Sequence, residues 1–215
     1  MTTTITKQAR QEVLLTVEDT SKYGYDRLTP YIHPPETKKN LPWAELVTLD
    51  LEDYELPDGK ERLAKQLEHV VHQVGFFYVK NFGLSDEQVQ QQFTIAKNFF
   101  NLDIEEKAKY EVDYTYADYN GWRRAGRGKI SDVRDNVEVF NIPKFAKDFE
   151  GKYPQPDLIK AHLPEIEVVV KALHSNIVLP LLRFFAIVLQ LPDEEYLVKQ
   201  HAYEKNSEDH FRYLI

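Results

Sequence analysis

Hydrophobic residues along this chain recur with the spacing of helices in some segments and with the alternation of strands in others. A helix is predicted from about Lys60 to Gln73, with an apolar face formed by Leu63, Leu67, Val70, Val71 and Val74. A second helix is predicted after Gly83, with an apolar face formed by Val89, Phe93, Ala96, Phe99 and Phe100. The apolar and aromatic run from Gly75 to Gly83 predicts a short buried strand between the two helices.

Further strands and helices are predicted by the same two periods. Short apolar or alternating runs predict strands at 46–51, at 137–142 and at 211–215. Apolar residues at helical spacing predict a long helix from residue 165 to about 190, and a short helix is predicted to begin at Pro192. Pro180 lies inside the long helix and removes one backbone hydrogen bond, so we expect a kink near Asn176.

Two helix starts carry the sequence of a capping box, in which a short polar side chain and a Gln or Glu three residues later bond each other's backbone. Ser85 with Gln88 marks the start of the second helix. Asp103 with Glu106 marks a short third helix that ends near Tyr110. The two pairs therefore predict where these helices begin.

Three segments lack a regular period. Residues 1–45 are polar and contain scattered prolines, so we expect an irregular arm with a short helix near Gln8 to Val17. Residues 111–135 are rich in Tyr, Gly, Arg and Asp and predict a long surface loop. Residues 144–164 contain three prolines and predict a connector. The expected organisation is thus an irregular polar arm followed by one domain over residues 46–215.

Composition limits the classes of function. Twenty-seven Lys and Arg against 35 Asp and Glu give a net charge of −8, which argues against nucleic-acid binding. The absence of cysteine excludes disulfides, thiolate metal sites and a cysteine nucleophile. The N-terminus lacks the apolar core of a secretory signal, and the apolar run from Ile177 to Leu191 is interrupted by Pro180, Arg183 and Gln190. We therefore expect a cytoplasmic protein without a membrane span.

Sequence patterns of catalytic and metal sites are missing. The histidines are His33, His69, His72, His162, His174, His201 and His210. None is followed two residues later by a carboxylate, so a strand cannot present a His-x-Asp pair to a metal. His69 and His72 flank the buried stripe of their helix and are interpreted as partly exposed structural residues. Nucleophile-elbow and phosphate-loop motifs are also missing, so we predict no catalytic residue and no metal ligand.

Residues 114–129 carry the best candidate for a binding site. Three tyrosines and a tryptophan are followed there by three arginines and a lysine, and aromatic faces with guanidinium groups can hold an anionic or aromatic small molecule. Tyr119, Trp122 and Arg123 are the candidate substrate-binding residues. The alternative interpretation is a solvated basic loop whose aromatic side chains anchor it on the core.

Four motifs follow one another along the chain: G-F-F-Y-V-K-N-F-G at 75–83 between two helices, E-E-K at 105–107, G-W at 121–122 and E-V-F-N-I at 138–142. In this order they resemble the N-terminal region of the non-haem iron(II) and 2-oxoglutarate-dependent dioxygenases, in the isopenicillin N synthase-like branch. The resemblance runs from about Leu46 to Ile215. In that family the Gly-Trp or Gly-Tyr pair lies in a loop near the mouth of the substrate site.

The resemblance implies an α+β fold. It would consist of the N-terminal helices and flanking strands of a double-stranded β-helix, or jelly roll, with most of the jelly roll missing. The strands at 46–51 and 76–81 would be outer strands of that sheet, and residues 211–215 would begin its first core strand.

The resemblance also implies chemistry that these residues do not encode. Enzymes of that family bind iron(II) through His-x-Asp and a distant second His, and bind 2-oxoglutarate through Arg-x-Ser; the sequence contains neither His-x-Asp nor Arg-x-Ser. We therefore expect a truncated family member that is catalytically incompetent as written and holds no cofactor. Its full-length relatives would use iron(II) and 2-oxoglutarate to oxidise a small organic substrate.

Two alternatives stay open. The chain could be a non-catalytic interaction or regulatory protein that binds a partner, or a second copy of itself, through open strand edges or the 114–129 loop. It could also be an enzyme of unrelated chemistry, although no residue spacing supports that interpretation. Because strand edges present unpaired backbone groups, we expect the isolated chain to be poorly stable, to associate or to need a partner.

Overall fold

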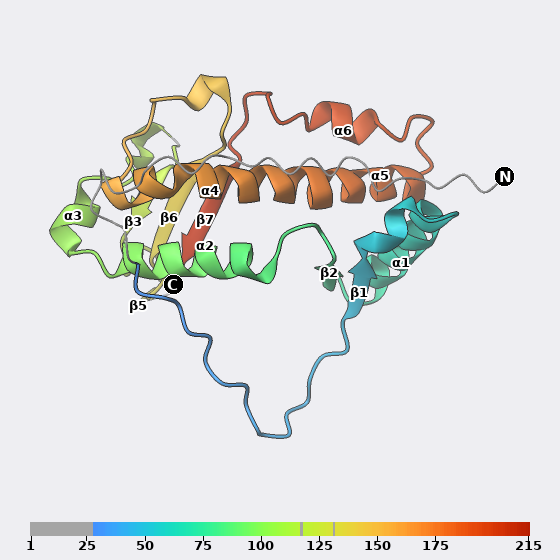
Figure 1. Cartoon of the computed structure of the whole chain (residues 1–215), viewed down its shortest axis with the longest axis horizontal. Coiled ribbons are helices and arrows are strands. Elements are labelled where there is room, and N and C mark those ends of the chain that lie inside the picture. Colours follow the sequence, from blue (N-terminus) through green and yellow to red (C-terminus); the bar gives the residue numbers. More distant parts are fainter. Residues whose placement is uncertain (1–27, 117, 131) are drawn as a thin grey trace.

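The computed structural model of the chain describes residues 28–116, 118–130 and 132–215 (Figure 1). Its helices are α1 (Gly59–Gln73), α2 (Asp86–Phe100), α3 (Ile104–Ala108), α4 (Asp157–Leu173), α5 (Leu179–Val188) and α6 (Tyr196–Gln200). Its strands are β1 (Val47–Asp50), β2 (Phe77–Lys80), β3 (Gly121–Arg123), β4 (Lys129–Ile130), β5 (Val133–Arg134), β6 (Val139–Pro143) and β7 (His210–Leu214). Short 3-10 turns lie at Leu51–Glu55, Tyr114–Tyr116 and Lys147–Phe149. This is an α+β fold, as expected.

Helices α4 and α5 form one continuous rod across the molecule, with α2 beside α4 and α1 on α5 (Figure 1). By length and composition alone, the 32 residues from Asp157 to Val188 could cross a membrane. In this fold the apolar side chains of the rod pack on the protein's other elements at both ends, Ile166 in one cluster and Phe184 in another. The rod therefore contributes side chains to both hydrophobic clusters.

The start of α4 was predicted wrongly. The helix begins at Asp157, so the connector expected at 144–164 ends at residue 156. Pro164 lies inside α4 and removes one backbone hydrogen bond, which in sequence reads as a helix break. The helix forms nevertheless, because Leu158 and Ile159 are buried in the main core and Pro156 accepts the first helical hydrogen bond from Lys160.

The irregularity expected near Asn176 is a π-helical turn at His174–Val178. Pro180 has no N–H to donate to the Asn176 carbonyl, and the backbone widens by one residue so that the Leu179 N–H donates to the His174 carbonyl. The Asn176 side chain donates to the Phe82 carbonyl at 2.9 Å. The turn is thus tied to the segment that follows β2.

His174, the first residue of this turn, makes stability depend on pH. Its ring stacks on His201 with centroids 5.6 Å apart and lies edge-on to Tyr203 at 5.0 Å. Burial lowers the pKa of His174 below its ordinary value of 6.5, and the hydrogen bond to the His201 carbonyl offsets only part of that effect. A folded pKa below the unfolded one means that stability is full above pH 6.5 and is lost as the pH falls.

We therefore expect His174→Gln to flatten the decrease in the free energy of unfolding between about pH 7.5 and pH 5.5, the range in which an unperturbed histidine titrates. Urea denaturation at a series of pH values measures this. The exposed His72→Gln serves as the matched control and should leave the slope unchanged. An equal slope in wild type and His174→Gln would contradict the assignment.

The strands form separate sheets. β1 and β2 pair in parallel through α1, whereas β3, β6 and β7 form an antiparallel sheet in the order β3-β6-β7. The strands predicted at 46–51, 76–81, 137–142 and 211–215 are confirmed. The predicted burial of the strand between Gly75 and Gly83 is wrong, since Phe76 and Tyr78 are exposed there. The predicted union of the strands in one sheet is not observed, because no strand in the described part of the chain lies between β2 and the three-stranded sheet to join them.

The described residues between 111 and 135 contain strands where a surface loop was predicted. They contain β3 and the small β4–β5 hairpin. Gly121, at the start of β3, has φ of +113° and lies so close to the Tyr110 carbonyl that a Cβ would stand 2.5 Å from its oxygen. Only glycine fits there. The strand is three residues long and pairs with distant β6, so periodicity could not reveal it.

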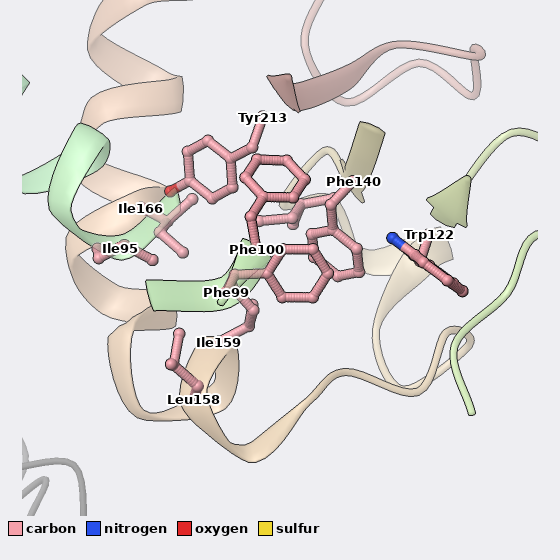
Figure 2. Packing of buried hydrophobic residues seen from close by; sticks show 10 residues of the cluster. Ile95, Phe99, Phe100, Trp122, Phe140, Leu158, Ile159, Ile166 and Tyr213 are labelled. Carbon is pink, nitrogen blue, oxygen red and sulfur yellow. The ribbon is translucent and has the colours of Figure 1, made fainter. Parts of the chain in front are cut away.

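The main core lies between α2, α4 and one face of the three-stranded sheet. Figure 2 shows Phe99, Phe100 and Phe140 gathered there, with the Phe99 and Phe140 rings 4.2 Å apart. The Tyr213 hydroxyl crosses the core and donates to Gln92 Oε1 at 2.8 Å, and burial raises the Tyr213 pKa far above its ordinary value. A second cluster joins α1, β1 and α5 and contains Leu49, Leu51, Leu63, Ala64, Leu67, Val70 and Phe184.

The structure describes part of the arm expected at residues 1–45. Residues 28–46 contain no helix or strand, and the segment leaves α2 and returns to the protein at β1 (Figure 1). The helix predicted near residues 8–17 lies outside the described residues.

One of the two predicted capping boxes is present. Ser85 accepts from the Gln88 N–H at 3.2 Å, and Gln88 accepts from the Ser85 N–H at 2.9 Å. At α3 the helix is correct but the box is wrong, since Asp103 makes no side-chain cap bond. The Glu106 carboxylate accepts from Lys109 and Tyr110 instead.

We expect Ser85→Ala to lower the free energy of unfolding by about 1 kcal/mol, because the Gln88 N–H loses its acceptor at the start of α2. Asp103→Ala is the matched control and should cost less than half as much, through the helix dipole alone. Urea denaturation of both variants measures the difference. Equal losses would contradict the assignment of the cap.

Candidate functional site

The three-stranded sheet has one apolar and one polar face. The register aligns Trp122 with Phe140 and Phe140 with Tyr213, and these side chains point into the main core (Figure 2). Successive residues of a strand point to opposite faces, so the intervening residues lie on the other side. They are Arg123, Val139, Asn141, His210, Arg212 and Leu214. Residues of α2 and α4 pack on the apolar face, whereas the other face carries the polar side chains, from the buried Asn141 to the exposed Arg212, and is the candidate site.

A row of hydrogen bonds crosses this polar face. The Asn141 side chain donates to the Tyr119 carbonyl and accepts from Arg212 Nε at 2.9 Å. Arg212 Nη2 lies 3.0 Å from His210 Nε2, and His210 Nδ1 lies 3.0 Å from the Glu208 carbonyl. The network assigns the proton of a neutral His210 to Nδ1, so that Nε2 accepts from the guanidinium. Arg212 is therefore held in place on an exposed surface.

This arrangement suits binding of an anion rather than catalysis. A fixed guanidinium presents parallel N–H groups that match a carboxylate or phosphate. We refer to Tyr119, Asn141, His210 and Arg212 as the polar row. No carboxylate belongs to it, so the row offers no pair of groups for general acid–base chemistry.

The loop beside the row is fixed by Asp135. Its carboxylate accepts from Arg123, from the Gly126 N–H at 3.0 Å and from the Gly128 N–H at 3.1 Å. Burial by itself would raise the pKa of the Asp135 carboxyl, but the hydrogen bond from Arg123 and the loop amides outweigh it and lower the pKa. Arg123 also donates to the Val137 carbonyl at 3.0 Å. Asp135 thus holds the turn that leads into the hairpin.

The predicted site residues do not converge on one surface. Trp122 is 2% exposed and points into the core, whereas Arg123 lies on the opposite face in its ion pair with Asp135. Tyr119 is 44% exposed, lies edge-on to Tyr114 and contributes its backbone carbonyl to the polar row. A role of these three residues in substrate binding stays a prediction.

Sequence reasoning missed a buried ion pair next to Trp122. Glu138 Oε1 accepts from Lys107 Nζ at 2.7 Å and from the Trp122 indole at 2.6 Å. The Lys107 and Glu138 side chains are only 8% and 18% exposed, and Lys107 also donates to the Phe100 carbonyl at 2.8 Å. The residues are 31 positions apart and belong to different elements, so no local pattern could pair them. Asn141 and Arg212, 71 positions apart, were missed for the same reason.

The residues do not fit an iron site. In the described ranges, no three His, Asp or Glu side chains are grouped so that they could hold a metal ion. His69 and His72 are exposed on α1, away from the polar row. A shallow hollow beside His69 is lined by Val47, Thr48, Lys65 and Gln66 and has no carboxylate. A non-haem iron site needs two imidazoles and a carboxylate on one side of the metal, and these are not brought together here.

Comparison with known proteins adds the family. Residues 46–160 match the family described as the N-terminal part of the non-haem dioxygenase in morphine synthesis. The 1-aminocyclopropane-1-carboxylate oxidase of Dictyostelium mucoroides is 27% identical over 74% of this chain and 46% of its own length. The 2-oxoglutarate-Fe(II) type oxidoreductase ppzD of Metarhizium majus is 26% identical over 59% of this chain and 39% of its own length. The chain spans less than half the length of these curated relatives.

A solved structure shows the same fold. A full-length Neurospora crassa protein, crystallised in complex with alpha-KG, superposes with a TM-score of 0.58 and 21% identity, over 70% of this chain and 49% of that protein. The family match covers more than half of the residues and includes α1, β2, α2, strand β3 with Trp122 and strand β6. The chain belongs to the non-haem dioxygenase N-terminal family, the N-terminal region of the 2-oxoglutarate-Fe(II) dioxygenases.

Proposed function

We propose that this polypeptide forms the helical and substrate-side half of a 2-oxoglutarate-Fe(II) oxygenase fold and that its 215 residues do not themselves bind catalytic iron or turn over 2-oxoglutarate. The observation that carries the proposal is the three-stranded sheet. Its apolar face is closed by α2 and α4, whereas its other face bears the polar row and, among the described residues, no group of metal ligands.

The complete enzyme's reaction, in this proposal, is the oxidation of a small organic molecule that carries an anionic or strongly polar group. Related proteins support this class of substrate: one relative is named a 1-aminocyclopropane-1-carboxylate oxidase, and the Neurospora protein has been solved with alpha-KG and thymine. Arg212, fixed by Asn141 and His210, would bind the polar group, and the exposed Tyr119 ring would lie beside it.

The test is an assay of succinate formation by the purified chain with ferrous ion, 2-oxoglutarate and ascorbate. We expect no succinate above the protein-free background, while a complete oxygenase of the family run in parallel produces it. Turnover that is proportional to the amount of chain and abolished by an iron chelator would overturn the proposal.

A non-catalytic interaction role is the second candidate, and one surface favours it. Val74, Phe76 and Tyr78 are exposed at the end of α1 and along β2, and β2 pairs only with β1 among the described strands. An apolar surface beside an open strand edge is suited to association by strand addition. Sedimentation velocity and thermal unfolding test this second candidate. A sharp monomer boundary together with a single cooperative unfolding transition would count against it.

A further inference from the structure

The outer face of α2 binds an extended backbone segment of the same chain, Thr29 to Tyr31. Asn98 clamps Thr29 from both sides: its Oδ1 accepts the Thr29 N–H at 3.0 Å, and its Nδ2 donates to the Thr29 carbonyl at 2.8 Å. Lys97 Nζ donates to the Pro30 carbonyl at 2.9 Å.

Tyr31 completes the set. Its N–H donates to Thr94 Oγ1 at 3.1 Å, and Gln90 donates to its carbonyl. Pro30 has no N–H, so every backbone donor and acceptor of the three residues is bonded by a side chain of α2.

Two side chains complete the contact. The Tyr31 ring stacks on Phe93 with centroids 5.2 Å apart, and Leu28 packs on the main core cluster. Gln90, Thr94 and Asn98 follow one another at intervals of four and therefore share a helix face. We call residues 28–31 the strap and this face of α2 its seat. The seat recognises mainly backbone, with one aromatic and one aliphatic anchor.

The tether that joins the strap to β1 makes no hydrogen bond or ion pair with the rest of the described chain. The hydrogen bonds within residues 32–45 are internal, such as the one from the Trp43 N–H to the Leu41 carbonyl. Ile32, Leu41 and Trp43 are exposed on it, and the tether runs clear of the helices (Figure 1). Moving the strap to another seat would therefore break no such bond between the tether and the body.

We propose that the strap is exchangeable and that two copies of this chain trade it, each strap occupying the other copy's seat. The contacts made within one chain and between two chains are the same, so exchange conserves them. The tether sets the equilibrium between the monomer and the exchanged dimer, because it keeps the strap near its own seat at an effective concentration on the order of 1 mM. Covering the exposed Ile32, Leu41 and Trp43 between two copies shifts this balance toward the dimer.

The absence of cysteine allows a direct test in the full chain. One copy carries Thr29→Cys and a size tag. The other carries Lys97→Cys, which gives up the hydrogen bond to the Pro30 carbonyl but leaves the contacts of Gln90, Phe93, Thr94 and Asn98 in place. The two are mixed, unfolded, refolded together and treated with a short bismaleimide. We expect a linked heterodimer at about 500 µM total chain and less than roughly a tenth of that yield at about 5 µM, as the effective concentration requires.

Two controls make the result specific to the seat. Glu87→Cys, ten residues from Lys97 and so about 15 Å along the same helix, should give little linked product. Asn98→Ala added to the Lys97→Cys copy should lower the linked yield at least fivefold. A third variant carries both Thr29→Cys and Lys97→Cys in one chain. If this variant links within itself while the mixed single-cysteine chains give no linked heterodimer at any concentration, the proposal is overturned. Linkage between chains that Asn98→Ala does not reduce would also overturn it, because the copies would then associate through another surface.

Discussion

Replacing Glu138 by glutamine is expected to lower the free energy of unfolding by roughly 3–5 kcal/mol, because the substitution leaves a buried ammonium without its counter-charge. Lys107 is 8% exposed and would keep the Phe100 carbonyl, the face of the Trp122 ring and a neutral amide oxygen as neighbours, none of which carries a negative charge. The Trp122 indole would face a weaker, neutral acceptor. Urea denaturation with a two-state fit measures the loss.

The control for this change is an ion pair on the surface. Arg127 and Glu111 form one with 41% and 36% exposed side chains, so Glu111→Gln should cost less than about 1 kcal/mol. Removing both charges, as Lys107→Met with Glu138→Gln, should recover part of the loss, since an apolar side chain can replace a buried pair at little cost. A loss from Glu138→Gln no larger than that from Glu111→Gln would show that the pair is not buried in solution.

Replacing Trp122 by alanine is expected to lower the free energy of unfolding by roughly 3–5 kcal/mol, as for other large buried aromatics. Trp122 is 2% exposed and packs beside Phe140 in the sheet (Figure 2). Tyr119→Ala, only three positions earlier, should change the free energy of unfolding by less than about 0.5 kcal/mol, because the Tyr119 ring is 44% exposed. Thermal and urea unfolding of the two variants measure the contrast.

The contrast decides how the predicted substrate residues can be tested. A loss of ligand binding in Trp122→Ala would be inseparable from a loss of fold, whereas Tyr119→Ala and Arg212→Lys leave the core intact. If Trp122→Ala proved as stable as wild type, the tryptophan would not lie in the core, and its assignment to the loop surface would be restored.

Local patterns in the sequence predicted the elements that local physics determines. The stripes of α1 and α2, the Ser85 cap and the strand after Gly75 follow from periodicity and hydrogen-bonding rules that act over a few residues. Periodicity also assigned Val71, Val74 and Phe93 to the apolar faces, and these three are exposed. Helix α4 was predicted eight residues too short, because Pro164 reads as a break when the burial of Leu158 and Ile159 is unknown.

The site depends on pairings that no local window contains. Asn141 meets Arg212 only because β6 pairs with β7 in one register, and a shift of one residue would turn each side chain to the other face. Trp122 was read as a loop residue because its strand is three residues long. The missing His-x-Asp pattern, by contrast, could be read from the sequence directly, since that spacing is local.

The proposed function requires that these 215 residues bind no catalytic iron. An anaerobic titration of the purified chain with ferrous ion, with and without 2-oxoglutarate, tests it most directly, followed by calorimetry and by visible absorption of the ferrous–2-oxoglutarate chelate. We expect no saturable binding and no new absorption band. One equivalent of ferrous ion bound per chain, tightened by 2-oxoglutarate, would contradict the claim.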